Sequence, residues 1–300
     1  MNEAGGHTLS FSGVSVDFGG LRAVEDFSLD VGAGEIVGLV GESGAGKTTV
    51  LKSAAGLLGP GGKVAAGSIR LCGVEVAGAD AREMARLRGG RAAYVFQDPK
   101  ASLDALFTVR DQFDECMRAA LGPAPSRAQR RAEQRRLLAD MGLEQPERVL
   151  ASRPHELSGG MCQRVVLAFA VACRPAVLLA DEPTSALDTV AQAGIVDVLR
   201  HVRDAYGVSI LVATHNLGVA ANLADRIAVM RGGRLVEAGP VREVIEHPAH
   251  PYTRELIAAV PQLPDRPAAD GPRPDEPQPD GRAGDPHPAG RLEEPAGGGR

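Results

Sequence analysis

One glycine-rich segment restricts the fold of this chain more than any other feature. The segment runs from Gly41 to Thr48 as GESGAGKT and fits the pattern G-x-x-x-x-G-K-[ST]. An apolar run, EIVGLV, precedes it, and a run with helical character, KTTVLKSAAGLL, overlaps its end. A glycine-rich turn that arose by chance would need neither a strand before it nor a helix after it. The order strand, glycine-rich loop and helix therefore predicts a phosphate-binding loop in an α/β fold.

The loop supplies backbone N–H groups that face inward and a helix N-terminus whose partial positive charge favours phosphate oxygens. Lys47 is placed to reach the β and γ phosphates of a nucleoside triphosphate, and the Thr48 hydroxyl is placed to bind Mg²⁺. The predicted nucleotide contacts in this loop are Gly41, Ser43, Gly44, Ala45, Gly46, Lys47, Thr48 and Thr49.

Two further apolar runs predict a parallel sheet. The runs at 176–180 (AVLLA) and 209–214 (SILVAT) show no alternation, which is typical of strands buried on both faces. The segment 191–206 between them has helical periodicity, which gives a strand, helix, strand unit. A further short strand, RAAYVFQ, ends at Gln97, and the composition is helical from there to about residue 173.

An acidic pair follows the run AVLLA. Side chains at the carboxyl end of a parallel strand emerge toward the same crevice as the phosphate loop. Asp181 suits a metal site, and Glu182 is placed to polarise a water for attack on the γ-phosphate. A helix N-cap is the alternative interpretation of the pair, and the phosphate loop makes it the weaker one.

A second anion site is predicted at LSGGM. Ser158, Gly159 and Gly160 open the helical run VVLAFAVAC, where the serine hydroxyl and the helix N–H groups can meet an anion. A chain needs one such site to hold its nucleotide. We therefore expect the second site to close over nucleotide that another subunit binds.

These motifs, in this order, resemble the ATP-binding cassette (ABC) family, whose signature LSGGQ stands here as LSGGM. The resemblance covers about residues 8–261. It implies an α/β P-loop nucleoside triphosphatase core at about 8–97 and 174–240 with an antiparallel β subdomain, an α-helical subdomain at about 98–173, and an extension at about 241–261. ATP and Mg²⁺ are the implied ligands.

The resemblance also implies roles for single residues. Gln97, in YVFQDP, would contact the metal and the lytic water, and His215 would contact the γ-phosphate. Asp188 would help to join two nucleotide sites across a dimer. Phe18 stands where the family usually carries an aromatic residue against adenine, although a phenylalanine among alternating apolar residues can equally be a core residue. His155, beside the signature, is interpreted as a packing or capping residue rather than a catalytic one.

Longer strings resemble the dipeptide, oligopeptide and nickel importer branch, above all RPHELSGGM and HPAHPYTRELIAAVP. This resemblance implies an ATPase that powers peptide uptake at the cytoplasmic face of the membrane. Its partners would be a second ATPase subunit, identical or different, two membrane permeases and an extracytoplasmic substrate-binding protein, without nucleic acid. Two departures, Cys162 where many relatives carry arginine and Asn216 where an acidic residue is usual, remove no primary catalytic group.

Three alternatives remain. The first is an importer ATPase for nickel or another small solute. The second is a soluble cassette protein acting on nucleic acid or ribosomes, although such proteins usually carry zinc-binding insertions, long coiled coils or two cassettes, and the sequence displays none of these. The third is an exporter ATPase, which the importer strings disfavour.

Composition fits these interpretations. The net charge of -5 argues against a chain that attracts nucleic acid or anionic lipid over its whole surface. The four cysteines are scattered without a C-x-x-C pair, which predicts a reducing compartment and no metal cluster. The residues after Pro261 lack the cysteine-rich extension of some members of the family that the chain resembles, which implies no iron–sulfur cluster. The longest apolar run, 165–173, is shorter than the roughly 20 residues of a membrane-spanning helix.

The two ends of the chain carry predictions of their own. The first residues, MNEAGGHTLSF, lack the basic start and apolar stretch of a secretory signal, which predicts a protein that stays in the cytosol. Residues 262–300 are rich in Pro, Gly, Asp and Ala with few large apolar side chains, and we predict them to be disordered.

Overall fold

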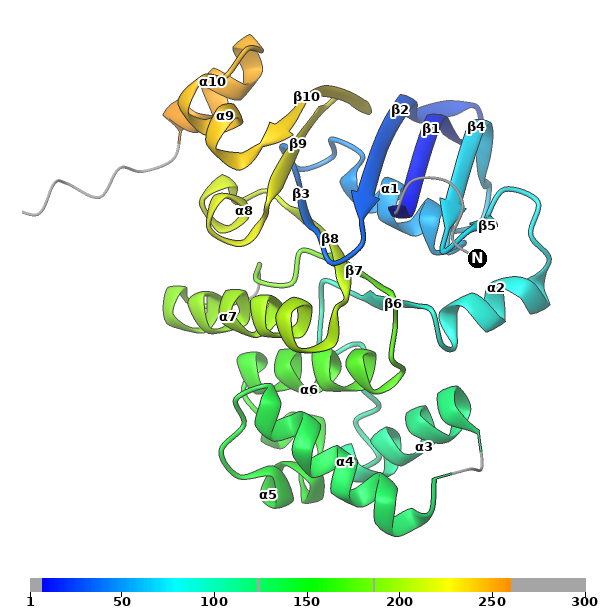
Figure 1. Cartoon of the computed structure of the whole chain (residues 1–300), viewed down its shortest axis with the longest axis vertical. Coiled ribbons are helices and arrows are strands. Elements are labelled where there is room, and N and C mark those ends of the chain that lie inside the picture. Colours follow the sequence, from blue (N-terminus) through cyan, green and yellow to red (C-terminus); the bar gives the residue numbers. More distant parts are fainter. Residues whose placement is uncertain (1–6, 123–124, 186, 260–300) are drawn as a thin grey trace, which may run out of the picture. The chain divides into compact units, whose positions relative to one another are not determined.

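The computed structural model describes residues 7–122, 125–185 and 187–259, which form two β-sheets and the helices around them (Figure 1). The tail at 262–300, predicted to be disordered, lies outside the described residues. Within the described part of the chain, every helix is too short or too polar to span a bilayer.

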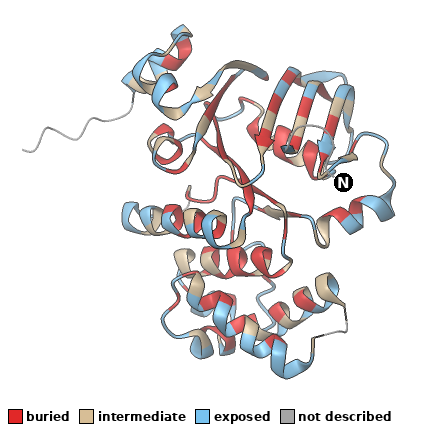
Figure 2. Cartoon of the chain, in the orientation of Figure 1, coloured by how far each residue is buried: buried red, intermediate tan, exposed pale blue. Residues whose placement is uncertain are grey.

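The larger sheet has six strands in the order β10-β9-β3-β8-β7-β6. Neighbouring strands from β9 to β6 run parallel, and β10 pairs with β9 antiparallel. Every residue of β3, β7 and β8 is buried (Figure 2), which confirms the strands predicted from unbroken apolar runs. The strands are β3 (Ile36–Val40), β6 (Ala92–Val95), β7 (Val177–Asp181), β8 (Ser209–Thr214), β9 (Arg226–Arg231) and β10 (Arg234–Pro240).

The two faces of this sheet pack into two different cores. Along β8, Ile210 and Val212 join the core formed with α6 (Gly159–Ala172) and α7 (Thr189–Tyr206). The alternate residues Leu211 and Ala213 join the core formed with α1 (Lys47–Ala54) and the smaller sheet. Burying a leucine or isoleucine side chain stabilises the fold by about 1.5–3 kcal/mol, so both faces contribute.

The smaller sheet is antiparallel, with the order β2-β1-β4-β5. The hairpin between its first two strands turns at Gly19 and Gly20, whose positive φ angles of 55° and 94° favour glycine in a two-residue turn of this kind. Phe11 and Phe27 meet edge to face on its inner side, with ring centroids 5.2 Å apart. The strands are β1 (His7–Phe18), β2 (Leu21–Gly32), β4 (Gly62–Leu71) and β5 (Val74–Glu75), and the short helix α2 (Ala81–Arg88) follows them.

The described residues of the segment predicted to be helical, between Gln97 and residue 173, contain four α-helices. Serine or threonine caps three of them: Thr108, Ser126 and Ser158 each accept a hydrogen bond from a backbone N–H of the first turn. Such caps stabilise a helix by about 1 kcal/mol each. The helices are α3 (Val109–Leu121), α4 (Arg127–Asp140), α5 (Pro146–Ala151) and α6, with a 3₁₀ turn at Pro154–Glu156 before the last.

The remaining helices follow the last strands of the sheet. Helix α8 (Leu217–Leu223) comes directly after β8, and α9 (Val241–Glu246) and α10 (Pro251–Ala258) come after β10. A third apolar cluster joins them to the sheet and includes Val40, at the end of β3. Because β3, β7 and β8 are parallel and adjacent, the loops at their carboxyl ends meet at one edge of the sheet.

Candidate active site

A pocket of about 860 Å³ opens at this edge. Its size falls within the range of roughly 300–1,000 Å³ that is common for small-molecule sites. The pocket brings together most of the predicted site, whereas Gly41 and Asp181 are buried and are hydrogen-bonded to Lys47 and Thr48 in its wall. The predicted residues that line it are Ser43, Gly44, Ala45, Gly46, Lys47, Thr48, Thr49, Gln97, Glu182 and His215.

The phosphate loop needs glycine for two different reasons. Gly44 and Gly46 have φ angles of 82° and 101°, a region that residues with a Cβ rarely adopt. Gly41 is required by space, because a Cβ there would lie 2.2 Å from the carbonyl oxygen of Met230 in β9. The start of the loop therefore packs closely against β9, and the glycines in its middle allow the positive φ angles of the tight turn.

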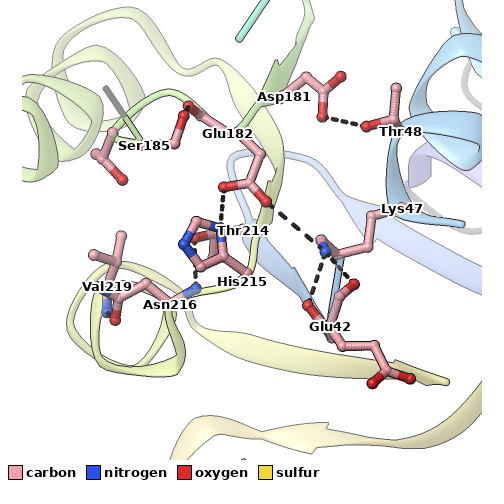
Figure 3. A network of polar contacts seen from close by, with 12 residues as sticks. Glu42, Lys47, Thr48, Asp181, Glu182, Ser185, Thr214, His215, Asn216 and Val219 are labelled. Carbon is pink, nitrogen blue, oxygen red and sulfur yellow. Dashed lines mark hydrogen bonds and ion pairs between the residues drawn. The ribbon is translucent and has the colours of Figure 1, made fainter. Parts of the chain in front are cut away.

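Lys47 points into the loop. Its Nζ donates to the carbonyl oxygens of Gly41 and Glu42 at 2.8 and 3.0 Å and lies 3.8 Å from Oε1 of Glu182 (Figure 3). Burial lowers the pKa of Lys47 from its usual value, and the carboxylates of Glu182 and Asp181 offset this in part. A buried ammonium of this kind favours an anionic ligand, whose charge would compensate its desolvation.

Asp181 and Thr48 form the part of the site that suits a cation. The Thr48 hydroxyl donates to Oδ1 of Asp181 at 2.9 Å, and the Tyr94 hydroxyl donates to Oδ2 at 3.0 Å. The described residues include no group of three His, Cys, Asp or Glu side chains that could hold a metal by themselves. This donor set fits Mg²⁺, which commonly takes one or two protein oxygens and fills its shell with phosphates and water. The acidic pair caps no helix, since the N-cap of α7 is Asp188.

Glu182 occupies a bend directly after β7. Its φ of 49° is unusual for a residue other than glycine and costs on the order of 1 kcal/mol. A hydrogen bond from its N–H to the carbonyl oxygen of Ala213, 2.9 Å long, holds the bend against the neighbouring strand. The side chain is buried, with one carboxylate oxygen toward Lys47 and the other 2.8 Å from Nδ1 of His215 (Figure 3). A carboxylate so placed can accept a proton from a water in the pocket.

Gln97 and His215 reach the pocket from the ends of two strands. Gln97 follows β6 by two residues, and His215 directly follows β8 with more than half of its side chain exposed. Asn216, the departure noted in the sequence, caps α8 by accepting a hydrogen bond from the N–H of Val219 at 3.1 Å. It therefore has a structural use that an acidic residue could also fill.

The residues of the signature and Asp188 lie outside this pocket. Ser158 is exposed and caps α6, and Gly159 and Gly160 form the first turn of that helix. An added Cβ on either glycine would come within 3.5 Å of Leu187 or Ala191, so the first turn of α6 lies against the start of α7. Asp188 caps α7 there by accepting from the N–H of Ala191 at 2.9 Å. The chain thus carries its two predicted anion sites on separate surfaces.

Phe18 and His155, which the sequence also singled out, do not line the pocket. Phe18 is half-buried at the end of β1 and packs beside Gly62, whose Cβ, if added, would lie 2.6 Å from the phenyl ring. Leu21 and Arg22 line the pocket on that side instead. Stacking of Phe18 on adenine stays a prediction. His155 is exposed in the 3₁₀ turn before the signature and does not line the pocket.

Two tyrosines that were not predicted from the sequence contact the site. Tyr94 holds Asp181, and the signal for it was weak: a single polar hydroxyl in an apolar strand one place before VFQ. Tyr252 accepts a hydrogen bond from the N–H of Glu42 at 3.0 Å. No local pattern indicates this contact, because the two residues are 210 positions apart.

Comparisons with known families match two parts of the chain. Residues 24–185 match the family described as ABC transporter, and residues 236–284 match the one described as oligopeptide/dipeptide transporter, C-terminal region. The second match extends beyond the described residues.

Curated relatives agree with these matches. The chain is 43% identical over 249 residues to a putative peptide import ATP-binding protein of Brucella melitensis, covering 81% of this chain and 73% of that one. It is 40% identical to the oligopeptide transport ATP-binding protein AmiE of Streptococcus pneumoniae, covering 82% and 69%. It is 39% identical to the glutathione import ATP-binding protein GsiA of Salmonella typhimurium, and this match covers 85% of this chain and 42% of the relative.

Solved structures show the same architecture. A dimeric ATP-binding cassette in a post-hydrolysis state, bound to ADP and phosphate, superposes with a TM-score of 0.68 and 28% identity, covering 78% of this chain and 99% of that chain. CbiO1 of Clostridium perfringens, part of an ABC transporter complex, superposes with a TM-score of 0.71, covering 81% and 92%. At 24% identity, this second likeness concerns the fold alone.

Proposed function

Because the chain belongs to the ABC transporter family of ATP-binding proteins, we propose that it is the ATP-hydrolysing subunit of an importer that takes up peptides. One observation carries the ATPase assignment. Lys47 at the start of α1, Asp181 and Glu182 at the end of β7, and His215 after β8 meet at one edge of the sheet, in the lining or the wall of a single pocket. The match of residues 236–284 to a peptide-transporter C-terminal region supports the choice of peptides.

In this proposal the phosphate loop binds the triphosphate of ATP. Its inward N–H groups and the N-terminus of α1 hold the phosphate oxygens, and Lys47 turns from its carbonyl partners to the β and γ phosphates. Thr48 and Asp181, with Gln97, would hold Mg²⁺, which neutralises charge on the phosphate oxygens. Loss of the two carbonyl hydrogen bonds of Lys47 is offset by its charge-assisted contacts to phosphate.

Glu182 orients and deprotonates the attacking water. Its carboxylate is fixed by the bend after β7 and by His215, so little reorganisation is needed when the water arrives. His215 keeps one ring nitrogen on Glu182 and presents the other edge to the pocket, where it can contact the γ-phosphate. A positioned base of this kind typically raises the rate by roughly 10²- to 10⁴-fold.

A second cassette completes the site. The exposed N-terminus of α6, with Ser158, Gly159 and Gly160, has the groups that bind an anion but lies outside the pocket of its own chain. We infer that these residues cover ATP held by a partner ATPase subunit and that Asp188 contacts that partner. ATP then favours the closed pair because it contacts both chains only in that state.

The remaining parts of the proposal concern the assembly. Two membrane permeases and an extracytoplasmic binding protein would complete the importer, with this chain at the cytoplasmic face of the membrane. Peptide is the favoured cargo because relatives in Brucella and Streptococcus carry peptide or oligopeptide names. Nickel or another small solute is the alternative cargo. Transport by the reconstituted importer in vesicles, with di- and oligopeptides against nickel, decides between them.

The test of the ATPase assignment compares two variants of the full chain, each assembled with its partner ATPase subunit. Glu182→Gln should bind ATP as the unchanged chain does and lose turnover by roughly 100- to 10,000-fold, because the amide cannot accept the proton. Lys47→Ala should weaken ATP binding itself. Glu246→Gln, a change at an exposed glutamate paired with Arg242, is the matched control and should change neither quantity. Normal hydrolysis by Glu182→Gln would remove Glu182 from its proposed role.

A further inference from the structure

Helix α10, the last helix of the described residues, contacts the phosphate loop through the side chain of Tyr252. The hydroxyl oxygen of Tyr252, on the first turn of α10, accepts a hydrogen bond of 3.0 Å from the backbone N–H of Glu42, the second residue of the loop. Tyr252 is only 5% exposed, so water competes poorly for this bond. The segment that carries the HPYTRELI string therefore has a direct contact with the nucleotide loop.

The contact acts on one particular peptide unit. The N–H of Glu42 and the carbonyl group of Gly41 belong to the same planar peptide. Tyr252 binds the N–H end of this unit, and Nζ of Lys47 binds the carbonyl end at 2.8 Å (Figure 3 shows Lys47 beside Glu42). When Lys47 turns to a phosphate, the carbonyl end loses its partner and the hydrogen bond to Tyr252 still fixes the plane.

Tyr252 is itself held firmly. The guanidinium group of Arg231, at the end of β9, lies over its ring at 4.6 Å from the centroid. The carboxylate of Glu237 accepts from the N–H groups of Ala249 and His250 at 2.8 and 3.0 Å, and this fixes the chain just before α10. Nδ1 of His250 in turn accepts from the N–H of Tyr252 at 3.1 Å.

We propose that Tyr252 is a positioning residue that fixes the first peptide of the phosphate loop and thereby sets the affinity for ATP. The proposal rests on ATP binding by this loop, as proposed above. The Tyr252 hydroxyl acts in the ground state and in the transition state alike, since it holds the loop and touches no reacting atom. Its removal should therefore raise KM and leave kcat unchanged.

The main experiment uses Tyr252→Phe in the full chain, which removes the hydroxyl and keeps the buried ring. Losing one hydrogen bond that orients the loop should weaken binding of a fluorescent ATP analogue, and raise KM for ATP, roughly three- to tenfold. Tyr206→Phe is the matched control, because its hydroxyl binds the carboxylate of Asp140 on α4, away from the loop. This control should leave both quantities unchanged.

The outcomes separate the inference from the function on which it rests. An unchanged chain that fails to bind the ATP analogue contradicts the proposed function. Normal binding by the unchanged chain together with an unaltered KM in Tyr252→Phe overturns the role of Tyr252, whatever happens to thermal stability. A lower kcat at constant KM overturns it as well, because that result indicates a smaller fraction of folded protein.

A second variant tests the path through the helix. Glu237→Ala removes the acceptor for the two N–H groups before α10 and touches no residue of the loop. It should raise KM in the same direction as Tyr252→Phe, and the double variant should be no worse than Tyr252→Phe alone, since both changes act through one hydroxyl. Additive effects of the two changes would contradict this path.

Discussion

The hydroxyl of Tyr94 offers a sharp test of the proposed Mg²⁺ site at Asp181. Tyr94→Phe removes the donor to Oδ2 of Asp181 and leaves the 2.9 Å hydrogen bond from Thr48 to Oδ1. The ring should stay in place, because it packs against Phe96 with centroids 4.6 Å apart. Burial and the neighbouring Asp181 raise the pKa of Tyr94 well above its ordinary value, so the hydroxyl remains a donor at any pH used in an ATPase assay.

The size of the effect follows from what this hydroxyl does. A hydrogen bond to a charged group stabilises by about 1.5–3 kcal/mol, and loss of a group that orients a metal ligand commonly weakens metal binding by roughly 10- to 100-fold. Asp181 keeps one of its two hydrogen bonds in the variant. We therefore expect the lower end, a loss of about tenfold in Mg²⁺ affinity, which corresponds to about 1.4 kcal/mol.

The assay is the Mg²⁺ concentration that gives half-maximal ATP hydrolysis at saturating ATP. Tyr94→Phe should shift this concentration upward about tenfold and change the maximal rate less. Tyr206→Phe removes another tyrosine hydroxyl that binds an aspartate, Asp140, and serves as the control. The same Mg²⁺ dependence in Tyr94→Phe and in the unchanged chain would refute the inference that Tyr94 orients Asp181 toward the proposed cation.

Two further predictions concern stability. Gly41→Ala places a Cβ 2.2 Å from the carbonyl oxygen of Met230 and should lower the free energy of unfolding by about 1–3 kcal/mol. Gly59→Ala, with open space around its Cβ, is the control and should lower it far less. Equal midpoints of urea unfolding for the two variants would contradict this prediction. The hydrogen bond from Arg130 lowers the pKa of Asp114 from 3.8, so Asp114 stabilises the fold above that pH and the stabilisation is lost as pH falls through the lowered value. Asp114→Asn should therefore be less stable than the unchanged chain at neutral pH, and the difference in the free energy of unfolding should disappear in acid. If urea titrations gave the same difference from neutral to acid pH, this linkage would be excluded.

The sequence predicted the central part of the fold well, because the parallel strands carry a strong signal. Unbroken apolar runs mark β3, β7 and β8, and each of these strands is buried along its whole length. Segments rich in Val, Phe and Leu (TLSFSGVSVDF and AVEDFSLDV) predict the first two strands of the smaller sheet, whereas its antiparallel arrangement followed only from the family resemblance. Strand β4 and helix α2 were not predicted from the residues, since much of β4 is exposed and only two residues of α2 are buried.

The residues of the candidate site also differ in how far the sequence predicts them. Residues in the phosphate loop and at strand ends were predictable, because motif spacing and parallel topology bring them together. The contacts of Tyr94 and Tyr252 were not, since each depends on side chains that come from distant parts of the chain and meet only after folding. The orientation of Glu182 also needed the structure, because no local pattern predicts a φ of 49° directly after a strand.

The strand order has a consequence for how the protein is made. Strand β3, which leads into the phosphate loop, has β8 and β9 as its neighbours, so its partners begin only at residue 209. At roughly 5–20 residues per second, a ribosome needs on the order of ten to thirty seconds to supply them after β3 has emerged. During that interval an apolar strand that is fully buried in the finished protein has no pairing partner, and an unpaired apolar strand of this kind is prone to aggregation.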